Sequence, residues 1–597
     1  MPSRTRPWTA GRASVVTSTP TIPDRPAFVV LGAGADGSRG VATLDVDGVV
    51  LDRLGVAEAG FASWVAECEA EWAPRWVWND APTWYSPLLE AGVRVARCHD
   101  LRLSHVILRE SALVDQGADV RTPSDWDAAT APVTPTEAPT LFELADRGDA
   151  RPRLPDDLDS AITEFERQRT AIAGSRDPGR LRLLVAAESA GALIAAELRA
   201  AGLPWDAVAH DELLTGILGA RPAGGGQPAN LEAAARRVRD ALGDPAASLD
   251  SQPKLLRALH RAGVLVESTS RWELAEQRHP VVEPLLEYKR LSRLLSANGW
   301  SWLSEWVHDG RFRPVYVPGG VVTGRWASSG GGALQLPRQL RAAVRADPGW
   351  RLIVADVAQL EPRVLAAMSG DTALADAARG RDLYAGIVDS GAVATRSEAK
   401  VAMLGAMYGA TTGDSGRLVP RLRRAFPRAM ALVDDAAQVG EDGGIVTTWL
   451  GRSSPPPSSG WGQAQSLATE AAASDADQAR ARRSARDRGR FTRNFVVQGT
   501  AAEWALAWLA DLRGRLAAIP DVTEEESAPR SGPVFERRPH LAFFLHDEVI
   551  IHAPARLVDE AATAARGSAI AAGRLLFGDF PLEFPLDLRI ADSADKD

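Results

Sequence analysis

The sequence contains very little cysteine and no long hydrophobic run. Cys68 and Cys98 are the only cysteines among 597 residues. This excludes a disulfide framework and a multi-cysteine zinc site, and it is typical of a reducing compartment such as the cytoplasm. The most apolar segment, residues 181–203, carries four charged side chains, so it lacks the ~18 uninterrupted apolar residues of a membrane span. We therefore expect a soluble, cytoplasmic protein.

A net positive charge is also missing, since the formal charge is -9. A nucleic-acid partner usually requires a basic surface, so this total argues mildly against one. The distribution is more informative, because residues 481–493 contain six arginines and one aspartate, and residues 417–428 contain five arginines and no acid. Such runs could face phosphates, although a solvated helix face is the commoner explanation of either run alone.

Composition divides the chain into patterned and unpatterned segments. Residues 1–26 are basic and rich in Ser, Thr and Pro, without the apolar core of a secretory signal, so we expect a disordered tail. Strand-like segments dominate up to about residue 100, a Pro- and Asp-rich linker follows at 115–155, and helical periodicity prevails beyond about residue 180. Low-complexity composition predicts flexible insertions at 453–485 and 521–539.

A glycine pattern near the N-terminus imitates a nucleotide-binding loop. Gly32, Gly34 and Gly37 have the Gly-x-Gly-x-x-Gly spacing of a dinucleotide site, which requires a helix directly after the glycines. The residues that follow, SRGVATLDVDG, have the pattern of another strand. A hairpin turn is therefore the favoured interpretation.

Two acidic positions lie next to apolar strands. An apolar strand over 350–356 ends in Asp356 and precedes a helix that contains Glu361; alone, such an aspartate is more often a helix N-cap. His546, Asp547 and Glu548 separate two apolar half-strands, as at the tip of a buried hairpin. Two aspartates at strand ends, from distant segments, are the oxygen ligands that a two-metal phosphoryl-transfer site requires.

A helical segment between the two aspartates carries a stripe of side chains that changes from basic to apolar and aromatic along the helix. Arg396, Lys400, Leu404 and Tyr408 recur every four residues and therefore share one side of a helix. Two cations suit a triphosphate, and the apolar residue and the aromatic ring suit a sugar and a base. A surface helix with two basic residues would not explain why the stripe continues to Leu404 and Tyr408.

A second helical segment repeats polar residues at the same spacing. Arg490, Asn494 and Gln498 recur every four residues in RFTRNFVVQGTAAEWALAWL. Asn and Gln side chains can donate to the acceptors that all base pairs share in the minor groove, which gives contact without sequence preference.

Together these segments resemble the signature motifs of the DNA polymerase I family (family A). The motifs stand in the family's order: Asp-x-x-Gln-x-Glu-x-Arg at 356–363, Arg-x-x-x-Lys-x-x-x-Leu-Gly-x-x-Tyr-Gly at 396–409, Asn-x-x-x-Gln-Gly-Thr-Ala-Ala at 494–502 and His-Asp-Glu at 546–548. Residues 321–337 resemble the family's Thr-Gly-Arg primer-template segment, and residues 268–294 resemble its thumb. The resemblance extends over about 180–597.

The resemblance implies an α/β multidomain fold, a right-hand polymerase preceded by a ribonuclease H-like exonuclease-fold domain at 27–180. The helical thumb would occupy 181–312, the palm 313–390 and 491–597, and the fingers 391–490. The implied partners are primer-template DNA and deoxynucleoside triphosphates, the implied cofactors are two Mg²⁺ ions that Mn²⁺ can replace, and a monomer is expected. The family's 5′-nuclease domain has no counterpart in the sequence.

The resemblance also implies roles for individual residues. Asp356 and Asp547 would ligate the metal ions, with Glu548 nearby. Lys400 is a candidate proton donor to pyrophosphate, and Glu361, held by Tyr408, would exclude a ribose 2′-hydroxyl. The implied nucleotide contacts are Arg396, Lys400, Leu404, Tyr408, Glu361, Gln359 and His546. The implied DNA contacts are Arg325, Gln335, Arg490, Asn494 and Gln498.

The sequence departs from the family pattern in the motifs around the site. Leu404 stands where the family has an aromatic residue that packs on the nucleotide sugar, and Met403 replaces the usual Asn. Val357 and Ala358 replace Tyr and Ser. We expect the smaller Leu404 to weaken nucleotide affinity and sugar discrimination.

The N-terminal domain departs further. The family's exonuclease uses an Asp-x-Glu, an Asp and a Tyr-x-x-x-Asp motif, whereas the nearest acids here are Asp45, Asp47, Asp80 and Asp100. No tyrosine occurs between Tyr85 and Tyr288, so the third motif is missing before the thumb. We therefore expect a degenerate domain that has lost 3′–5′ exonuclease activity.

Two alternatives to a DNA polymerase stay open. A single-subunit RNA polymerase shares the motif plan, but Glu361 as a sugar gate argues against it. A catalytically retired DNA-binding scaffold is disfavoured because both aspartates, Arg396 and Lys400 are present. The expected location is the cytoplasm, associated with the nucleoid, and the expected task is repair or gap filling.

Overall fold

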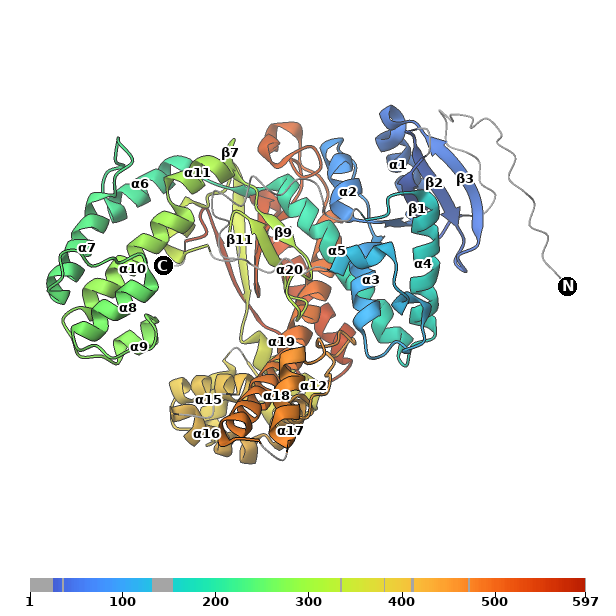
Figure 1. Ribbon diagram of the computed structural model, residues 1–597. Coiled ribbons are helices and arrows are strands. Elements are labelled where there is room, and N and C mark those ends of the chain that lie inside the picture. The colour runs from blue at the N-terminus through green and yellow to red at the C-terminus, as the bar shows by residue number, and fades with distance from the viewer. Residues whose placement is uncertain are drawn as a thin grey trace. The chain divides into compact units, whose positions relative to one another are not determined.

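The computed structural model describes residues 25–34, 37–130, 154–332, 336–380, 382–409, 413–470 and 473–595 (Figure 1). They divide into two compact units. Unit 1 takes its residues from 1–201, 315–329 and 353–590, and unit 2 from 202–314, 330–352 and 591–597. Nearly all of the tail expected at 1–26 lies outside the described residues.

Unit 1 begins with a five-stranded sheet in the order β3-β2-β1-β4-β5. β1 pairs antiparallel with β2 and parallel with β4, and β4 pairs parallel with β5. The strands are β1 (Phe28–Ala33), β2 (Arg39–Leu44), β3 (Val50–Val56), β4 (Arg75–Trp78) and β5 (Cys98–Asp100). The surrounding helices are α1 (Glu58–Trp72), α2 (Ala81–Glu90), α3 (Leu101–Glu110), α4 (Leu158–Ala173) and α5 (Pro178–Ala201).

The central strand of this sheet is buried on both faces. Val29 and Leu31 of β1 belong to one apolar cluster with residues of α1 and α2. Val30, which points to the opposite face, packs with Phe165 of α4 in another cluster. Alternate side chains of a strand face opposite sides of its sheet, so a continuous apolar run is the sequence that two covering layers require.

The glycines at 32–37 form a hairpin, as predicted. Leu31 pairs with Val41, and Gly32 pairs with Gly40, in the antiparallel ladder of β1 and β2. A strand thus follows where a nucleotide-binding loop would need a helix. A Cβ on Gly32 would lie 2.3 Å from the backbone nitrogen of Leu158, so glycine is required here for the close approach of the residue that begins α4.

A four-stranded sheet in the order β12-β13-β11-β14 occupies the centre of the C-terminal part of unit 1. Its strands are β11 (Trp350–Val357), β12 (His540–Leu545), β13 (Glu548–Pro554) and β14 (Leu586–Ala591). Helices α19 (Asp475–Ala517) and α20 (Val558–Phe577) pack against each other and against this sheet. A two-stranded sheet of β9 (Val315–Val317) and β10 (Ala327–Gly330) completes the strands of this unit.

A helical subdomain of unit 1 packs around one apolar cluster that includes Met403, Leu422 and Phe495. Its helices are α12 (Leu360–Ser369), α13 (Thr372–Ala377), α14 (Leu383–Asp389), α15 (Arg396–Tyr408), α16 (Gly413–Ala425), α17 (Pro427–Glu441), α18 (Ser459–Thr469) and the first part of α19. The periodic apolar residues of α15 explain its place here, since Ala399, Ala402, Met403 and Ala406 are all buried.

The flexible insertion predicted at 453–485 is wrong. Ser458 caps the start of α18, and Ser474 and Asp477 form a capping box at the start of α19. α18 packs along α19, and the Gln465 side chain donates to the Ala481 carbonyl at 3.0 Å. The low-complexity composition concealed a helix that is stabilised by its neighbour rather than by its own propensity.

The flexible insertion predicted at 521–539 is also wrong. Val522 and Phe535 are buried, and Phe535 joins the apolar cluster of the N-terminal sheet. The linker predicted at 115–155 is ordered over its first part, where Val120 and Trp126 are buried. Residues 131–153 of this linker lie outside the described residues.

Unit 2 is mainly helical. Its elements are β6 (Leu203–Pro204), α6 (Ala207–Leu218), α7 (Ala229–Leu242), α8 (Gln252–Arg261), α9 (Arg271–Ala275), α10 (Val282–Asn298), α11 (Trp300–Trp306), β7 (Val307–His308) and β8 (Arg311–Phe312). Trp205, His210, Trp302 and Phe312 form an aromatic cluster with ring centroids 4.8 to 5.7 Å apart. The unit begins at Gly202, so residues 181–201, which the expected thumb region included, belong to unit 1.

Candidate active site

Two aspartates from distant segments lie on neighbouring strands. Asp356 is the penultimate residue of β11, and Asp547 lies in the two-residue turn between β12 and β13. β11 and β13 are neighbours in the sheet, and the Val357 N–H donates to the Asp547 carbonyl at 3.0 Å. The alternative role of Asp356 as a helix N-cap does not apply, since Gln359 holds that position before α12.

The two carboxylates interact electrostatically. Burial, and next the negative charge of Asp356, raise the pKa of the Asp547 carboxyl to about 6, while nearby Arg325 acts in the opposite direction. A raised carboxyl pKa means that the surroundings disfavour the ionised form. At neutral pH the pair therefore concentrates negative charge that a bound cation would neutralise.

The donor set suits Mg²⁺. Mg²⁺ commonly takes one or two protein carboxylates and completes its shell with water and substrate phosphates. Within the described ranges no group of three or more His, Cys, Asp or Glu side chains could hold a metal ion. Glu548 is buried at the start of β13, so it does not complete such a group with Asp356 and Asp547, and its catalytic role stays a prediction.

A third carboxylate connects two helices beside the aspartates. Glu361, in the first turn of α12, accepts a hydrogen bond of 2.6 Å from the Tyr408 hydroxyl at the end of α15. The same carboxylate forms an ion pair with Arg325. Burial, and next the charge of Glu361, raise the pKa of Tyr408, so this tyrosine stays protonated and continues to donate. The predicted pairing of Glu361 with Tyr408 is confirmed.

The stripe on α15 forms as its spacing predicted. Thr395 caps the helix by accepting from the Glu398 N–H at 3.1 Å, and Arg396, at the first position, donates to Asp382 at 2.6 Å. Lys400 is exposed and has no hydrogen bond or ion pair with any other described residue. Leu404 packs at the edge of the buried cluster, so its side chain is half-buried and offers no aromatic face.

The polar residues of α19 lie in its middle part. Arg490 pairs with Asp487 on the same helix, and its Cγ would lie 2.7 Å from a Cβ on Gly409. Glycine at 409 therefore lets α19 approach the end of α15. The Asn494 Oδ1 is buried without a hydrogen-bond partner among the described residues, and Gln498 is half-buried one turn later.

The remaining predicted site residues have mixed outcomes. Gln359 adopts a left-handed conformation at φ 48° and accepts from the Leu383 N–H at 3.2 Å. His546 also has a positive φ, 58°, and burial, followed by the charge of Arg325, lowers its pKa. Gln335 lies outside the described residues. The contacts of these residues with nucleotide or DNA stay predictions.

The sequence patterns assigned no role to two residues near the site, Arg363 and Asp382. Arg363 is fully buried and donates to the carbonyls of Ala358, Ala378 and Gly380 at 2.7 to 2.9 Å, so it fixes the chain between β11 and α12. Asp382 caps α14 and holds Arg396. The capping pattern Asp-Leu-Tyr was visible in the sequence, but neither long-range contact leaves a sequence signal.

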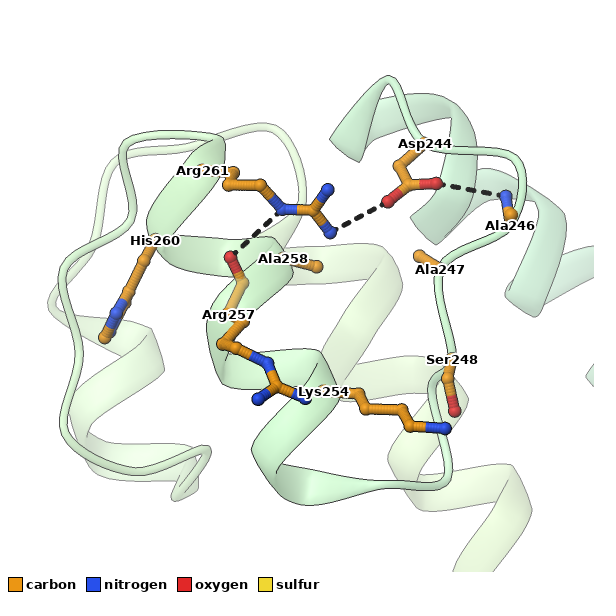
Figure 2. A pocket seen from close by; sticks show the side chains of 9 residues that line it. All are labelled: Asp244, Ala246, Ala247, Ser248, Lys254, Arg257, Ala258, His260 and Arg261. Carbon is orange, nitrogen blue, oxygen red and sulfur yellow. Dashed lines mark hydrogen bonds and ion pairs between the residues drawn. The ribbon is translucent and has the colours of Figure 1, made fainter.

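Unit 2 carries a basic groove of about 500 Å³ between α8 and the loop that precedes it. Figure 2 shows three basic side chains projecting from α8, namely Lys254, Arg257 and Arg261. Arg261 pairs with Asp244 at 3.0 Å, whereas Lys254 and Arg257 form no ion pair with any described residue. This groove was not predicted, although basic residues at a spacing of three and four on one helix could have indicated it.

Three of the four acids named for the N-terminal domain, Asp45, Asp80 and Asp100, are engaged in structural contacts. Asp45 accepts from the N–H groups of Asp47 and Val49 in the turn between β2 and β3, at 2.9 and 2.8 Å. Asp80 pairs with Arg102 at 2.6 Å. Asp100 is fully buried and caps both α2 and α3 by accepting from the N–H groups of Ala81 and Leu103, at 2.8 and 3.0 Å.

Comparison with known proteins identifies the family. The fold and site are those of a mixed α/β chain with paired aspartates at strand ends. Residues 254–590, more than half of the chain, match the family model described as DNA polymerase family A. The chain therefore belongs to DNA polymerase family A.

Individual relatives agree with this assignment. Thermostable DNA polymerase I of Thermus aquaticus is 26% identical over 401 residues, which are 62% of this chain and 42% of the relative. DNA polymerase I of Chloroflexus aurantiacus is 29% identical over 346 residues, which are 53% and 33%. The chain thus matches less than half of the length of either relative.

One solved structure shares the fold. It is described as the POL domain of Pol1 from M. smegmatis in complex with DNA primer-template and dNTP, and it is 18% identical, with a TM-score of 0.63 over 96% of this chain and 95% of that chain. The expected α/β polymerase-type fold is confirmed. None of the helices in the described ranges combines the length and the apolar character that spanning a lipid bilayer requires.

Proposed function

We propose that the chain is a DNA-directed DNA polymerase that adds deoxynucleotides to a primer 3′ end. The observation that carries the proposal is the electrostatic coupling of Asp356 and Asp547 on neighbouring strands. Its substrates would be primer-template DNA and deoxynucleoside triphosphates, and the chain would act as a monomer at the nucleoid in the cytoplasm. Repair or gap filling is its proposed task.

Asp356 and Asp547 would hold two Mg²⁺ ions, which Mn²⁺ could replace. When bound, such ions supply Lewis-acid stabilisation of the attacking and leaving oxygens. The protein would contribute position and charge. Arg396 and Lys400 on α15 would bind the triphosphate, with Lys400 as proton donor to the departing pyrophosphate. Arg396 must first exchange its contact with Asp382 for phosphate oxygens, which its planar fork binds well.

Glu361 would select deoxyribose. Its carboxylate is held by Tyr408 on one side and by Arg325 on the other, so it cannot move aside for an added 2′-hydroxyl without breaking both contacts. This arrangement favours a DNA polymerase over the single-subunit RNA polymerase alternative. The retired-scaffold alternative is disfavoured because two interacting, partly buried carboxylates reduce the stability of the metal-free fold.

DNA would be bound through phosphates and minor-groove edges. Asn494 and Gln498 would contact the minor groove, and the unpartnered Oδ1 of Asn494 supports this, since a buried polar atom normally has a partner. Arg325 and Arg490 would contact primer and template near the terminus. In unit 2, the groove formed by Lys254 and Arg257 would bind backbone phosphates without regard to sequence.

We also propose that the N-terminal sheet is a ribonuclease H-like exonuclease domain without 3′–5′ exonuclease activity. The carboxyl end of β1 carries Leu31, Gly32 and Ala33, with no acid. Asp45 and Asp47 lie in the turn after β2, and Asp100 serves as a cap. Leu158 packs directly against Gly32, which places the start of α4 over the end of the central strand.

Gap filling on a primed template tests the polymerase assignment. The native chain should extend the primer with Mg²⁺ and deoxynucleotides, and Asp356→Ala should abolish extension while the fold is retained. Asp376→Ala, at an exposed aspartate of α13 that pairs only with Arg379 among the described residues, is the matched control and should extend like the native chain. Extension by Asp356→Ala at the native rate would overturn the proposal.

Removal of nucleotides from a mispaired 3′ end tests the second proposal. With divalent metal and no deoxynucleotides, the native chain should release no nucleotide. Release that disappears in the Asp47→Ala/Asp100→Ala double variant would show that the exonuclease is active.

A further inference from the structure

A tight turn at 447–453, which we call the Arg452 turn, lies outside the polymerase motifs named above. The Thr448 N–H donates to the Arg452 carbonyl at 2.9 Å, and the Thr448 hydroxyl accepts from the Arg452 N–H at 2.9 Å. Thr448 and Arg452 are both buried. A buried charge is costly unless it is paired and hydrogen-bonded, so the position of Arg452 requires a physical explanation.

Arg452 pairs with a buried carboxylate of α5. Its Nη2 donates to the Glu188 Oε2 at 2.6 Å, and the two side chains are 10% and 1% exposed. Moving two charges out of water costs energy that their mutual attraction often fails to offset, and apolar side chains of similar volume are often at least as stabilising. Stability alone therefore does not explain this pair, and the contacts of its guanidinium group become informative.

The guanidinium group of Arg452 lies against a second turn, residues 321–326 between β9 and β10, which we call the Arg325 turn. A Cβ on Gly324 would lie 2.5 Å from the Arg452 Nε, so the guanidinium group packs directly on the backbone of this turn. Gly324 has φ 84°, and the turn is closed by the Val321 N–H, which donates to the Arg325 carbonyl at 3.0 Å. Any side chain at 324 would displace Arg452.

Helix α19 contacts both turns. A Cβ on Gly499 would lie 2.3 Å from the Thr448 Cγ2 and 3.1 Å from the Thr323 carbonyl oxygen. The Glu503 carboxylate accepts from the Leu450 N–H at 2.9 Å and also from the Thr448 hydroxyl. The helix that would contact the minor groove therefore also packs against the Arg452 turn and the Arg325 turn.

The N-terminal domain completes the support of the Arg452 turn. The Ser111 hydroxyl, directly after α3, donates to the Gly451 carbonyl at 2.8 Å, and the Ala112 N–H donates to the Ser453 hydroxyl at 2.7 Å. A Cβ on Gly451 would lie 2.5 Å from the Leu113 Cδ1. The domain for which we propose no exonuclease activity thus holds a turn that contacts the polymerase site.

We propose that Arg452 is a positioning residue of the polymerase reaction, which fixes the Arg325 turn and thereby the carboxylate of Glu361. This inference rests on the proposed function, because it requires that Glu361 selects deoxyribose. Arg325 forms an ion pair with Glu361, so a displacement of the Arg325 turn displaces or releases that carboxylate. Arg452 acts through Arg325 and is not itself a catalytic residue.

The test measures the ratio of kcat/KM for deoxynucleotides to kcat/KM for ribonucleotides. A variant that folds less completely loses active protein equally for both nucleotides, so a purely structural role leaves this ratio unchanged. Arg452→Gln/Glu188→Gln removes both charges together and leaves no buried charge unpaired. This variant should lower the ratio roughly 10-fold, within the ~100-fold that a displacement of 1 Å can cost.

A double-mutant cycle with Arg325→Ala identifies the route of the effect. In the Arg325→Ala background, Arg452→Gln/Glu188→Gln should change the ratio by less than about twofold, because Glu361 no longer depends on the turn. If the residues acted independently, their fold-changes would multiply to within about twofold. Arg452→Lys keeps the charge but loses the planar fork, so it should lower the ratio less than the Gln pair does.

The ion pair of Glu197 and Arg513 provides a matched control. It also begins on α5, has the same N–O distance of 2.6 Å and is buried. Glu197→Gln/Arg513→Gln should keep the native ratio even if thermal unfolding shows a loss of stability. An equal fall of the ratio in this control would assign the effect to general destabilisation and overturn the inference.

The inference is also overturned if Arg452→Gln/Glu188→Gln keeps the native ratio, or if its full effect persists in the Arg325→Ala background. If the Gln pair does not fold, Arg452→Lys takes its place in the same cycle and is subject to the same two outcomes. Primer extension by the native chain is measured in parallel. Failure of the native chain to extend would count against the proposed function, whereas extension together with an unchanged ratio would count against the role of Arg452 alone.

Discussion

The pair formed by Asp356 and Asp547 should destabilise the metal-free protein. Replacement of one carboxylate by a neutral amide should therefore increase stability. The pKa of Asp547 is raised from 3.8 to about 6. A raised carboxyl pKa lowers stability as pH rises from the unfolded value through the folded value. At pH 7.5 the ionised form is therefore unfavourable in the folded state, and Asp547→Asn should stabilise the hairpin of β12 and β13.

The size of the destabilisation follows from the raised pKa of Asp547. About two pKa units correspond to about 3 kcal/mol. Asp547 is only half-buried by its accessible surface, so solvent screening reduces this to ~1–2 kcal/mol. The stabilisation by Asp547→Asn should be less than half as large at pH 4.5, because most Asp547 is protonated in the folded chain at that pH. With Mg²⁺ at about 100 times its dissociation constant, metal binding should stabilise the folded native chain by ~2.7 kcal/mol. The Asp547→Asn variant should largely lack this stabilisation.

Hydrogen exchange measured by mass spectrometry on peptides over 540–554 reports the local opening free energy, which is suitable because a chain of two units need not unfold in one step. The native chain and Asp547→Asn are compared at pH 7.5 and 4.5, with EDTA and with Mg²⁺. Asp382→Asn is the matched control. Burial opposes ionisation of Asp382, but the hydrogen bond and charge of Arg396 outweigh it and lower its pKa, so that substitution should destabilise its own region at pH 7.5. Destabilisation of the β12–β13 hairpin by Asp547→Asn in EDTA at pH 7.5 would refute the reasoning.

Three further predictions concern substitutions around α15. Lys400→Ala should lower kcat by about 10²- to 10⁴-fold, as expected for a lost proton donor; a change confined to KM in steady-state extension would leave Lys400 only a binding role. Glu361→Ala should reduce discrimination against ribonucleotides by roughly 10- to 200-fold, measured as the ratio of kcat/KM for the two sugars, and Tyr408→Phe should have a smaller effect of the same sign; unchanged ratios would exclude the gate. Leu404→Phe should lower the apparent nucleotide dissociation constant in single-turnover extension, because an aromatic ring adds stacking area; an unchanged or raised constant contradicts this.

Short-range patterns in the sequence predicted the centre of the site. An apolar strand before Asp356 and apolar strands on both sides of Asp547 placed both carboxylates at strand ends, and four-residue spacing placed Lys400 on one side of a helix. These features depend on local periodicity, which a sequence displays directly. The family motifs then indicated which segments come together.

Long-range contacts were not predictable in the same way. Arg363 donates to the Gly380 carbonyl, 17 positions away, and to the Glu583 carbonyl, 220 positions away. Asp382 contacts Arg396 across a helix and a turn. Such contacts depend on the packed fold, so no local pattern encodes them. The polar composition of 453–485 and 521–539 predicts flexibility, yet a few buried residues such as Phe535 are enough to anchor a polar segment.

Helix α19 has a mechanical consequence. It runs for 43 residues without a proline, about 64 Å of uninterrupted helix. Near its far end, Arg513 pairs with buried Glu197. No proline kink interrupts this helix. If Arg490 and Gln498 contact the same nucleic acid, the spacing between the two contacts is constant. Each advance by one nucleotide must then break both contacts together or move the strand past them.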